Sequence, residues 1–232
     1  MSVQPSPTRR SVGSGARGTT QITAAAFLFD MDGTLVDSHE SIEAVWFAFA
    51  ERHGVDKAVM SKALPGRLAA DIILRVLGPT ADLREALNWI REREHQSLVP
   101  VRPIAGAEQF LASVPADRWA VVTSASRSMM VRRLTAAGLP TPKVAVCAED
   151  VAVGKPDPEG FRSAAEQLGV SIESCIVFED ADAGIAAAQA AGARCIAIGN
   201  ESGPQVARVD DFESLRVAVR DGALVIDVDP VR

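Results

Sequence analysis

Two acidic residues, Asp30 and Asp32, stand at the end of the apolar run in the segment FLFDMDGTL, where Gly33 permits a sharp turn. One carboxylate at such a place can attack phosphorus and form an aspartyl-phosphate. A second can give a proton to the leaving group and later take one from the attacking water. The pair therefore predicts covalent phosphoryl chemistry, with either acid available for either role.

A second acidic pair, Glu179 and Asp180, follows the apolar run Cys175–Phe178. Carboxylates near a phosphate repel it, so such a site needs a cation. Mg²⁺ prefers oxygen ligands and often takes one or two carboxylates together with phosphate and water. If the two acidic segments meet, they predict a magnesium site.

Two further segments offer groups that bind negative charge. The loop Gly154-Lys155-Pro156 offers a positive charge, and Thr123-Ser124-Ala125 offers a hydroxyl and a backbone N–H. Donors directed at developing negative charge are often worth a few kcal/mol each. Each piece alone is more often a turn, a helix cap or an exposed loop. Their joint occurrence, each after an apolar run, favours a site.

The elements that must position these residues are short apolar runs separated by helical stretches. The runs are too short for helices and predict strands buried on both faces: Ala25–Phe29, Trp119–Thr123, Val144–Cys147, Cys175–Phe178 and Arg194–Ile198. The predicted helices are Ser126–Ala137, Pro158–Leu168 and Ala181–Ala191, closed by Gly138, Gly169 and Gly192. This alternation predicts an α/β fold with a mostly parallel sheet, in which ligands bind at the carboxyl ends of the strands.

A long stretch between the first two predicted strands has helical periodicity instead, over Ser41–His53, Ala69–Leu77 and Asp82–Leu98. It predicts an inserted helical domain over residues 38–102, with the core formed by 24–37 and 103–232. Near the end of the chain, Val206–Val209 is a weak strand candidate, and the apolar run Ala223–Val228 has no predicted place.

Composition limits the classes of function. The chain is 47% hydrophobic with a net charge of −6 and no cluster of basic and aromatic residues, so nucleic acid is a poor candidate partner. No apolar run reaches the roughly 18 residues that span a bilayer. Cys147, Cys175 and Cys195 lie in apolar runs without metal-ligand spacing, which indicates core residues in a reducing compartment, and we expect a cytoplasmic protein.

The first 23 residues are rich in Ser, Gly and Thr, hold several arginines and lack acidic residues. This composition cannot bury a core, so it favours a disordered tail, although a transit peptide has a similar composition.

Taken in order, DxDGT, a strand-ending Ser, GKPDP and ED resemble the four motifs of the haloacid dehalogenase superfamily over about Phe27 to Gly199. The resemblance implies a Rossmann-like, three-layer α/β/α core with a small helical cap. It also implies that Asp30 is the nucleophile and Asp32 the general acid and base. The remaining implied roles are Mg²⁺ binding by Asp30, the backbone carbonyl of Asp32, Glu179 and Asp180, and phosphate binding by Ser124, Ala125 and Lys155. Motif position favours Ser124 over Thr123 as the hydroxyl that binds phosphate.

Differences between this sequence and several subgroups of the family reduce the number of reactions that the chain is expected to catalyse. Asp32 argues against dehalogenases and phosphonoacetaldehyde-cleaving members, which lack that aspartate. The β-phosphoglucomutases carry a cap histidine where this chain has Ile42. The stretches Trp119–Ser126, Ala136–Pro140 and Ala148–Val151 resemble the sugar phosphatases, among them the hexose- and polyol-phosphate, glycerol-phosphate and 2-deoxyglucose-6-phosphate phosphatases. In those enzymes a cap loop similar to the one holding Gly66 and Arg67 reaches the substrate; the alternative for Arg67 is a surface arginine at a helix start.

We therefore expect a Mg²⁺-dependent phosphatase that acts on a small sugar or polyol phosphate through a phospho-aspartate. Its partner would be a small phosphorylated metabolite, and the protein would be a monomer or dimer. The alternatives are a β-phosphoglucomutase-like phosphotransferring isomerase, a phosphoglycolate-type phosphatase and a non-catalytic protein that uses this fold.

Overall fold

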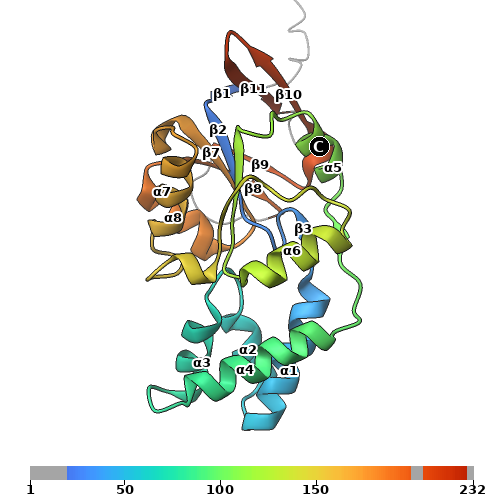
Figure 1. Cartoon of the computed structure of the whole chain (residues 1–232), viewed down its shortest axis with the longest axis vertical. Coiled ribbons are helices and arrows are strands. Elements are labelled where there is room, and N and C mark those ends of the chain that lie inside the picture. The colour runs from blue at the N-terminus through green and yellow to red at the C-terminus, as the bar shows by residue number, and fades with distance from the viewer. Residues whose placement is uncertain (1–19, 200–205, 229–232) are drawn as a thin grey trace, which may run out of the picture.

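The core of the computed structural model is a six-stranded parallel sheet with the strand order β6-β5-β2-β7-β8-β9 (Figure 1). The structure describes residues 20–199 and 206–228. The strands of this sheet are β2 (Ala26–Phe29), β5 (Trp119–Val122), β6 (Val144–Val146), β7 (Cys175–Glu179), β8 (Arg194–Ile198) and β9 (Ala207–Val209). The expected α/β fold with a parallel sheet is confirmed.

Strand register brings the polar segments to one edge of the sheet. Phe29 at the end of β2 pairs with Val121 of β5 on one side and with Phe178 of β7 on the other. The residues that follow these strands therefore emerge together. Because every residue of β2, β5 and β7 is buried, the first polar side chain can appear only where a strand ends.

Helices cover both faces of the sheet. In Figure 1, α5 (Ala107–Ala112) and α6 (Arg127–Ala136) lie on one side, and α7 (Glu159–Gln167) and α8 (Asp182–Ala191) lie on the other. The face toward α5 and α6 holds a cluster of aromatic rings, formed by Phe27, Phe29, Phe110, Trp119, Phe178 and Phe212. The other face is packed with smaller side chains, so α7 and α8 contribute mostly alanines there.

The predicted core helices and their glycine ends are confirmed to within two residues. Gly192 ends α8 in the left-handed conformation, and Gly138 and Gly169 follow α6 and α7 with positive φ. Three short 3-10 turns join elements of the core: η1 (Ala148–Asp150), η2 (Ile172–Ser174) and η3 (Phe212–Ser214).

A separate group of helices is inserted after β2 (Figure 1). It consists of α1 (His39–His53), α2 (Lys57–Ala63), α3 (Ala69–Leu77) and α4 (Leu83–Gln96), which pack around an apolar cluster of their own. The helix α2 was not predicted. The two connections to the core pair as short strands, β3 (Val36–Asp37) with β4 (Arg102–Pro103). We keep 38–102 as the proposed bounds of this cap, and all four helices lie within them.

A three-stranded antiparallel sheet, with the order β1-β11-β10, extends the core at the end opposite the cap (Figure 1). It contains β1 (Thr20–Ala24), β10 (Leu215–Arg220) and β11 (Ala223–Val228), so the run that had no predicted place is its central strand. The prediction of a tail over residues 1–23 is wrong for residues 20–23. They form a strand because Ile22 and Ala24 are buried beside β11, a contact with the far end of the chain. Residues 1–19 lie outside the described residues.

The three cysteines are free and buried, as expected of core residues. In the described part of the chain, none of the helices has both the length and the apolar character needed to cross a membrane.

Candidate active site

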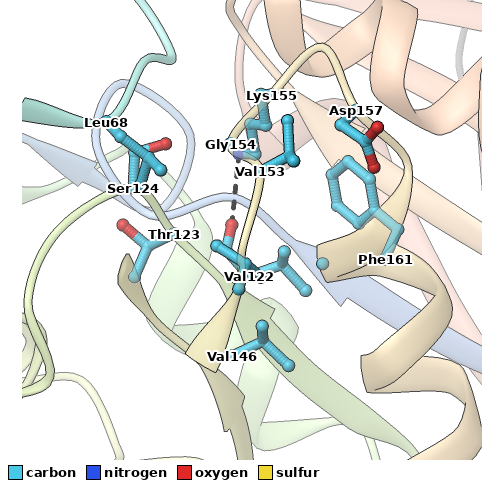
Figure 2. Close-up of a pocket in the computed structure, with 12 residues that line it drawn as sticks. Leu68, Val122, Thr123, Ser124, Val146, Val153, Gly154, Lys155, Asp157 and Phe161 are labelled. Atoms are coloured by element: carbon cyan, nitrogen blue, oxygen red, sulfur yellow. Dashed lines mark hydrogen bonds between the residues drawn. The ribbon is translucent and has the colours of Figure 1, made fainter. Parts of the chain in front are cut away.

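Lys155 lies at the centre of the polar edge of the sheet. Its Nζ donates hydrogen bonds to Oδ1 of Asp30 and to Oε1 of Glu179 at 2.6 Å. It also donates to the carbonyl of Val122 at 3.2 Å, the contact drawn in Figure 2. The Lys155 side chain is only 6% exposed. Three segments far apart in sequence, each predicted to carry chemistry, therefore meet through one buried ammonium group.

The carboxylates around Lys155 form a compact cluster. One oxygen from each of Asp30, Glu179 and Asp180 lies within 4.8 Å of the others. Burial raises the pKa of Asp30 well above its usual value, and Lys155 offsets only part of that rise. Burial, followed by repulsion from Glu179, raises the pKa of Asp180 to about 7.

These carboxylates are short of positive charge. Burial alone would lower the pKa of Lys155, but the carboxylates of Asp30 and Glu179 outweigh it and raise that pKa, so the ammonium stays charged. One ammonium cannot balance three carboxylates. A divalent cation would supply the missing charge, and an all-oxygen donor set suits Mg²⁺.

Two glycines make room for the acidic side chains. A Cβ on Gly33 would lie 2.1 Å from Oδ2 of Asp180, and a Cβ on Gly184 would lie 1.6 Å from Oε1 of Glu179. Gly33 also has a φ of 89°, which other residues rarely adopt. The hydroxyl of Thr34 donates to Oδ1 of Asp180 at 2.9 Å. Sequence reasoning missed Gly184, because its role depends on how α8 packs against the end of β7.

The side chain of Asp32 is held by a different set of groups. Its Oδ1 accepts a hydrogen bond from the Ser38 hydroxyl at 2.6 Å, and its Oδ2 accepts one from Nη1 of Arg133 at 2.7 Å. Arg133 also donates from Nη2 to Oε1 of Glu94 in the cap at 3.3 Å. Burial raises the pKa of Glu94, and Arg133 partly offsets this rise. Sequence reasoning missed Ser38, Glu94 and Arg133. Metal binding by the carbonyl of Asp32 stays a prediction.

A cavity of about 90 Å³ lies between the core and the cap. Its core wall is formed by Asp30, Asp32, Thr123, Ser124, Ala125 and Arg133. Its cap wall is formed by Ile42, Trp46, Leu64, Gly66, Arg67, Ala69, Ile72 and Glu94. The predicted cap loop with Gly66 and Arg67 thus faces the predicted nucleophile across one small cavity.

Both candidate hydroxyls line this cavity. The hydroxyl of Ser124 donates to the carbonyl of Gly66 at 2.9 Å, whereas the hydroxyl of Thr123 accepts from the backbone N–H of Ala125 at 3.1 Å. The choice between them as phosphate ligand stays a prediction.

The cap is seated on the core at a second point. Leu68 of the cap lines one pocket together with Ser124 and Gly154 of the core (Figure 2). A Cβ on Gly154 would come within 2.4 Å of the Leu68 side chain. Only a glycine therefore allows this approach of the cap to the loop that carries Lys155.

The fold and this arrangement of side chains are those of one large enzyme class. Residues 24–192 match the family model for haloacid dehalogenase-like hydrolases, and the chain belongs to that family.

Two named relatives narrow the comparison. The chain is 35% identical over 179 residues to hexitol phosphatase A of Escherichia coli (strain K12), which covers 74% of this chain and 82% of that protein. It is 30% identical over 199 residues to 2-deoxyglucose-6-phosphate phosphatase 1 of Saccharomyces cerevisiae, which covers 77% of this chain and 81% of that protein.

Among solved structures, a hydrolase from Pseudomonas syringae superposes with a TM-score of 0.72 at 22% identity. That match covers 81% of this chain and 94% of the other. At this identity the likeness supports the fold alone.

The close approach at Gly184 gives a direct test of the acidic cluster. Alanine normally stabilises a helix relative to glycine by up to about 1 kcal/mol. In G184A, however, the new methyl group must displace the Glu179 carboxylate. We expect phosphate release in the presence of Mg²⁺ to fall on the order of 10–100-fold, as for changes that disturb the support of metal ligands.

The matched control for this substitution is G160A on α7, where the new Cβ would be 3.0 Å from a methyl group of Val122 and no carboxylate must move. Steady-state assays and thermal melts of both variants decide the matter. Wild-type activity in G184A would contradict the assigned role.

Proposed function

We propose that this chain is a phosphatase that hydrolyses a small sugar or polyol phosphate through an aspartyl-phosphate on Asp30. The observation that carries the proposal is the buried contact of Asp30 with Lys155, inside an acidic cluster and under a cap-covered cavity. A carboxylate held this way has a fixed direction of attack and a neighbouring positive charge to receive the phosphoryl oxygens.

In the first step, Asp30 attacks phosphorus and the bond from phosphorus to the substrate oxygen breaks. Asp32 gives a proton to that oxygen, which leaves as an alcohol. In the second step, Asp32 takes a proton from water as the water attacks the aspartyl-phosphate, and this releases inorganic phosphate and free Asp30. Asp32 suits both steps because it lines the same cavity as Asp30 and its orientation is fixed by Ser38 and Arg133.

Asp30, Glu179, Asp180 and the backbone carbonyl of Asp32 would hold Mg²⁺. When bound, that ion would neutralise negative charge on the carboxylates and the phosphoryl group. Lys155 orients Asp30 and places a positive charge next to the phosphoryl oxygens. Ser124 and the N–H of Ala125 would donate to those oxygens on leaving their present acceptors, the carbonyl of Gly66 and the hydroxyl of Thr123.

The substrate class rests on the relatives and on the cavity. The two relatives are named as phosphatases of a hexitol phosphate and of 2-deoxyglucose 6-phosphate. The cavity is small, and Arg67 and Glu94 supply polar groups on its cap side. Ile42 lines the cavity at the position of the mutase histidine, and its apolar side chain disfavours a phosphotransferring isomerase.

The nucleophile is tested by D30N, which keeps the size of the side chain and removes its negative charge. We expect phosphate release from an aryl phosphate and from hexitol, hexose and glycerol phosphates to fall to background. The control is D37N, because the Asp37 side chain is 64% exposed and lies outside the cavity. Activity of D30N near that of the wild type would refute the assignment.

The metal requirement is tested by treating the purified protein with a chelator. Three clustered carboxylates without a divalent cation repel an incoming phosphate, so we expect activity to disappear and to return when excess Mg²⁺ is added. Calorimetry should detect Mg²⁺ binding to the wild type and weaker binding to D180N. Full activity after exhaustive chelation would rule out the proposed requirement.

Recognition by the cap is tested by R67A. Arg67 faces the cavity, whereas Arg75 on α3 is exposed elsewhere on the cap, so R75A is the control. We expect R67A to raise KM for the preferred sugar or polyol phosphate about 10-fold or more, as for loss of a hydrogen bond to a charged group, and to change KM for a simple aryl phosphate much less. Equal effects on both substrates would argue against specific recognition.

A further inference from the structure

Arg133 links the catalytic loop of the core to the cap through one buried guanidinium. It lies on α6 with its side chain 6% exposed, and it contacts a carboxylate on each side. Nη1 is 2.7 Å from Oδ2 of Asp32, and Nη2 is 3.3 Å from Oε1 of Glu94 near the end of α4. These two carboxylates belong to different parts of the molecule, which are joined covalently only through the paired strands β3 and β4.

A guanidinium suits this place for physical reasons. It stays charged at any ordinary pH, and its planar fork can satisfy two carboxylates at once. Both partner side chains are largely buried, with 18% of Asp32 and 20% of Glu94 exposed. If the cap moves away, Arg133 loses Glu94 and the environment of Asp32 opens to water.

We propose that Arg133 is a positioning residue that sets the Asp32 carboxylate for proton transfer when Glu94 arrives with the closing cap. The inference rests on the proposed phosphatase function and assigns a role to two residues that the reaction itself does not require. Ser38, the first residue of the cap, fixes one oxygen of Asp32, and Arg133 of the core fixes the other. Each carboxylate oxygen keeps a second lone pair, so these contacts leave room for the proton.

The choice of substrate separates positioning from a merely structural role. An alkoxide is a poor leaving group and needs a proton from Asp32 as its bond to phosphorus breaks. A nitrophenolate leaves readily without one. Because kcat/KM reports the reaction up to the first irreversible step, which forms the aspartyl-phosphate, a misplaced Asp32 lowers kcat/KM for a sugar or polyol phosphate far more than for 4-nitrophenyl phosphate.

Arg132 offers a matched control on the same helix. Its guanidinium donates to the carbonyl of Ser97, at the end of α4, at 3.2 Å. Arg132 therefore also joins α6 to the cap segment, but its guanidinium bonds to Ser97 rather than to Asp32. Loss of Arg132 tests the effect of weaker docking of the cap alone.

The experiment compares R133M, R133K, E94Q and R132M with the wild type on a hexitol phosphate and on 4-nitrophenyl phosphate. We expect R133M to lose on the order of 10²-fold in kcat/KM on the hexitol phosphate, the lower end of general acid–base effects, and less than about 3-fold on the aryl phosphate. R133K should recover part of the loss, since one ammonium can still reach Asp32. R132M should change both substrates by the same factor.

Glu94 provides the second variant. E94Q keeps the shape of the side chain and removes its charge, so we expect a smaller loss with the same preference for the aryl phosphate. Adding E94Q to R133M should cause little further loss, because both act through one contact network. R133M leaves two largely buried carboxylates without their cation, so R133K and E94Q also serve as the test if R133M does not fold.

Equal losses on both substrates in R133K and E94Q, or the same substrate dependence in R132M, would overturn the role of Arg133 and leave the phosphatase assignment intact. A wild-type protein that hydrolyses the aryl phosphate but no sugar or polyol phosphate would instead refute the proposed substrate class and this inference with it. The two failures are therefore distinguishable.

Discussion

Burial of carboxylates beside one ammonium group is the constraint on which the rest of the site depends. Asp30 extends β2 into the polar edge, where its N–H donates to the carbonyl of Phe178 and its side chain meets Lys155. Removing one partner of such a buried pair typically costs about 3–5 kcal/mol, because the remaining charge stays desolvated. The sheet must therefore bring its strand ends into register, and glycines at positions 33 and 184 must leave space for the acids. Because the cluster holds more negative than positive charge, it favours the binding of a divalent cation.

The cap imposes the second constraint, because closing it over the cavity expels bulk water and strengthens the electrostatic interactions inside. The cap reaches the core at several places that coincide with catalytic segments. Gly66 accepts from Ser124, Leu68 packs on Gly154 and Glu94 pairs with Arg133. Each contact joins the cap to a different loop or helix at the carboxyl edge. The closed cap therefore contacts the segment predicted to bind phosphate, the loop that carries Lys155 and the arginine that holds the predicted proton-transfer group, Asp32.

The sequence predicts the residues at strand ends well and those on helices poorly. Asp30 and Asp180 directly follow β2 and β7, and parallel strands must bring such positions to one edge, whereas Lys155 lies in the loop between η1 and α7. Arg133 and Gly184 lie inside helices. The sequence of a helix predicts which of its faces is buried, but not which atoms of another element contact that face. The strand β1 was missed for a related reason: its partner β11 comes from the far end of the chain, and no local pattern reports that pairing. The sequence could not predict contacts between elements whose relative positions are set by packing.

The contact between Ser124 and Gly66 shows how substrate and cap would compete. A serine hydroxyl has one proton to donate, and here that proton goes to the carbonyl of Gly66. If Ser124 binds phosphate as proposed, its hydroxyl must release Gly66 when substrate enters. Closure over a bound substrate must then rely on other contacts, such as the packing of Leu68 on Gly154, the pair of Glu94 with Arg133 and the hydrogen bond from Arg132 to Ser97. The pair of Glu94 with Arg133, which holds Asp32, therefore contributes more to closure in the substrate-bound state. This is the state in which Asp32 transfers its proton.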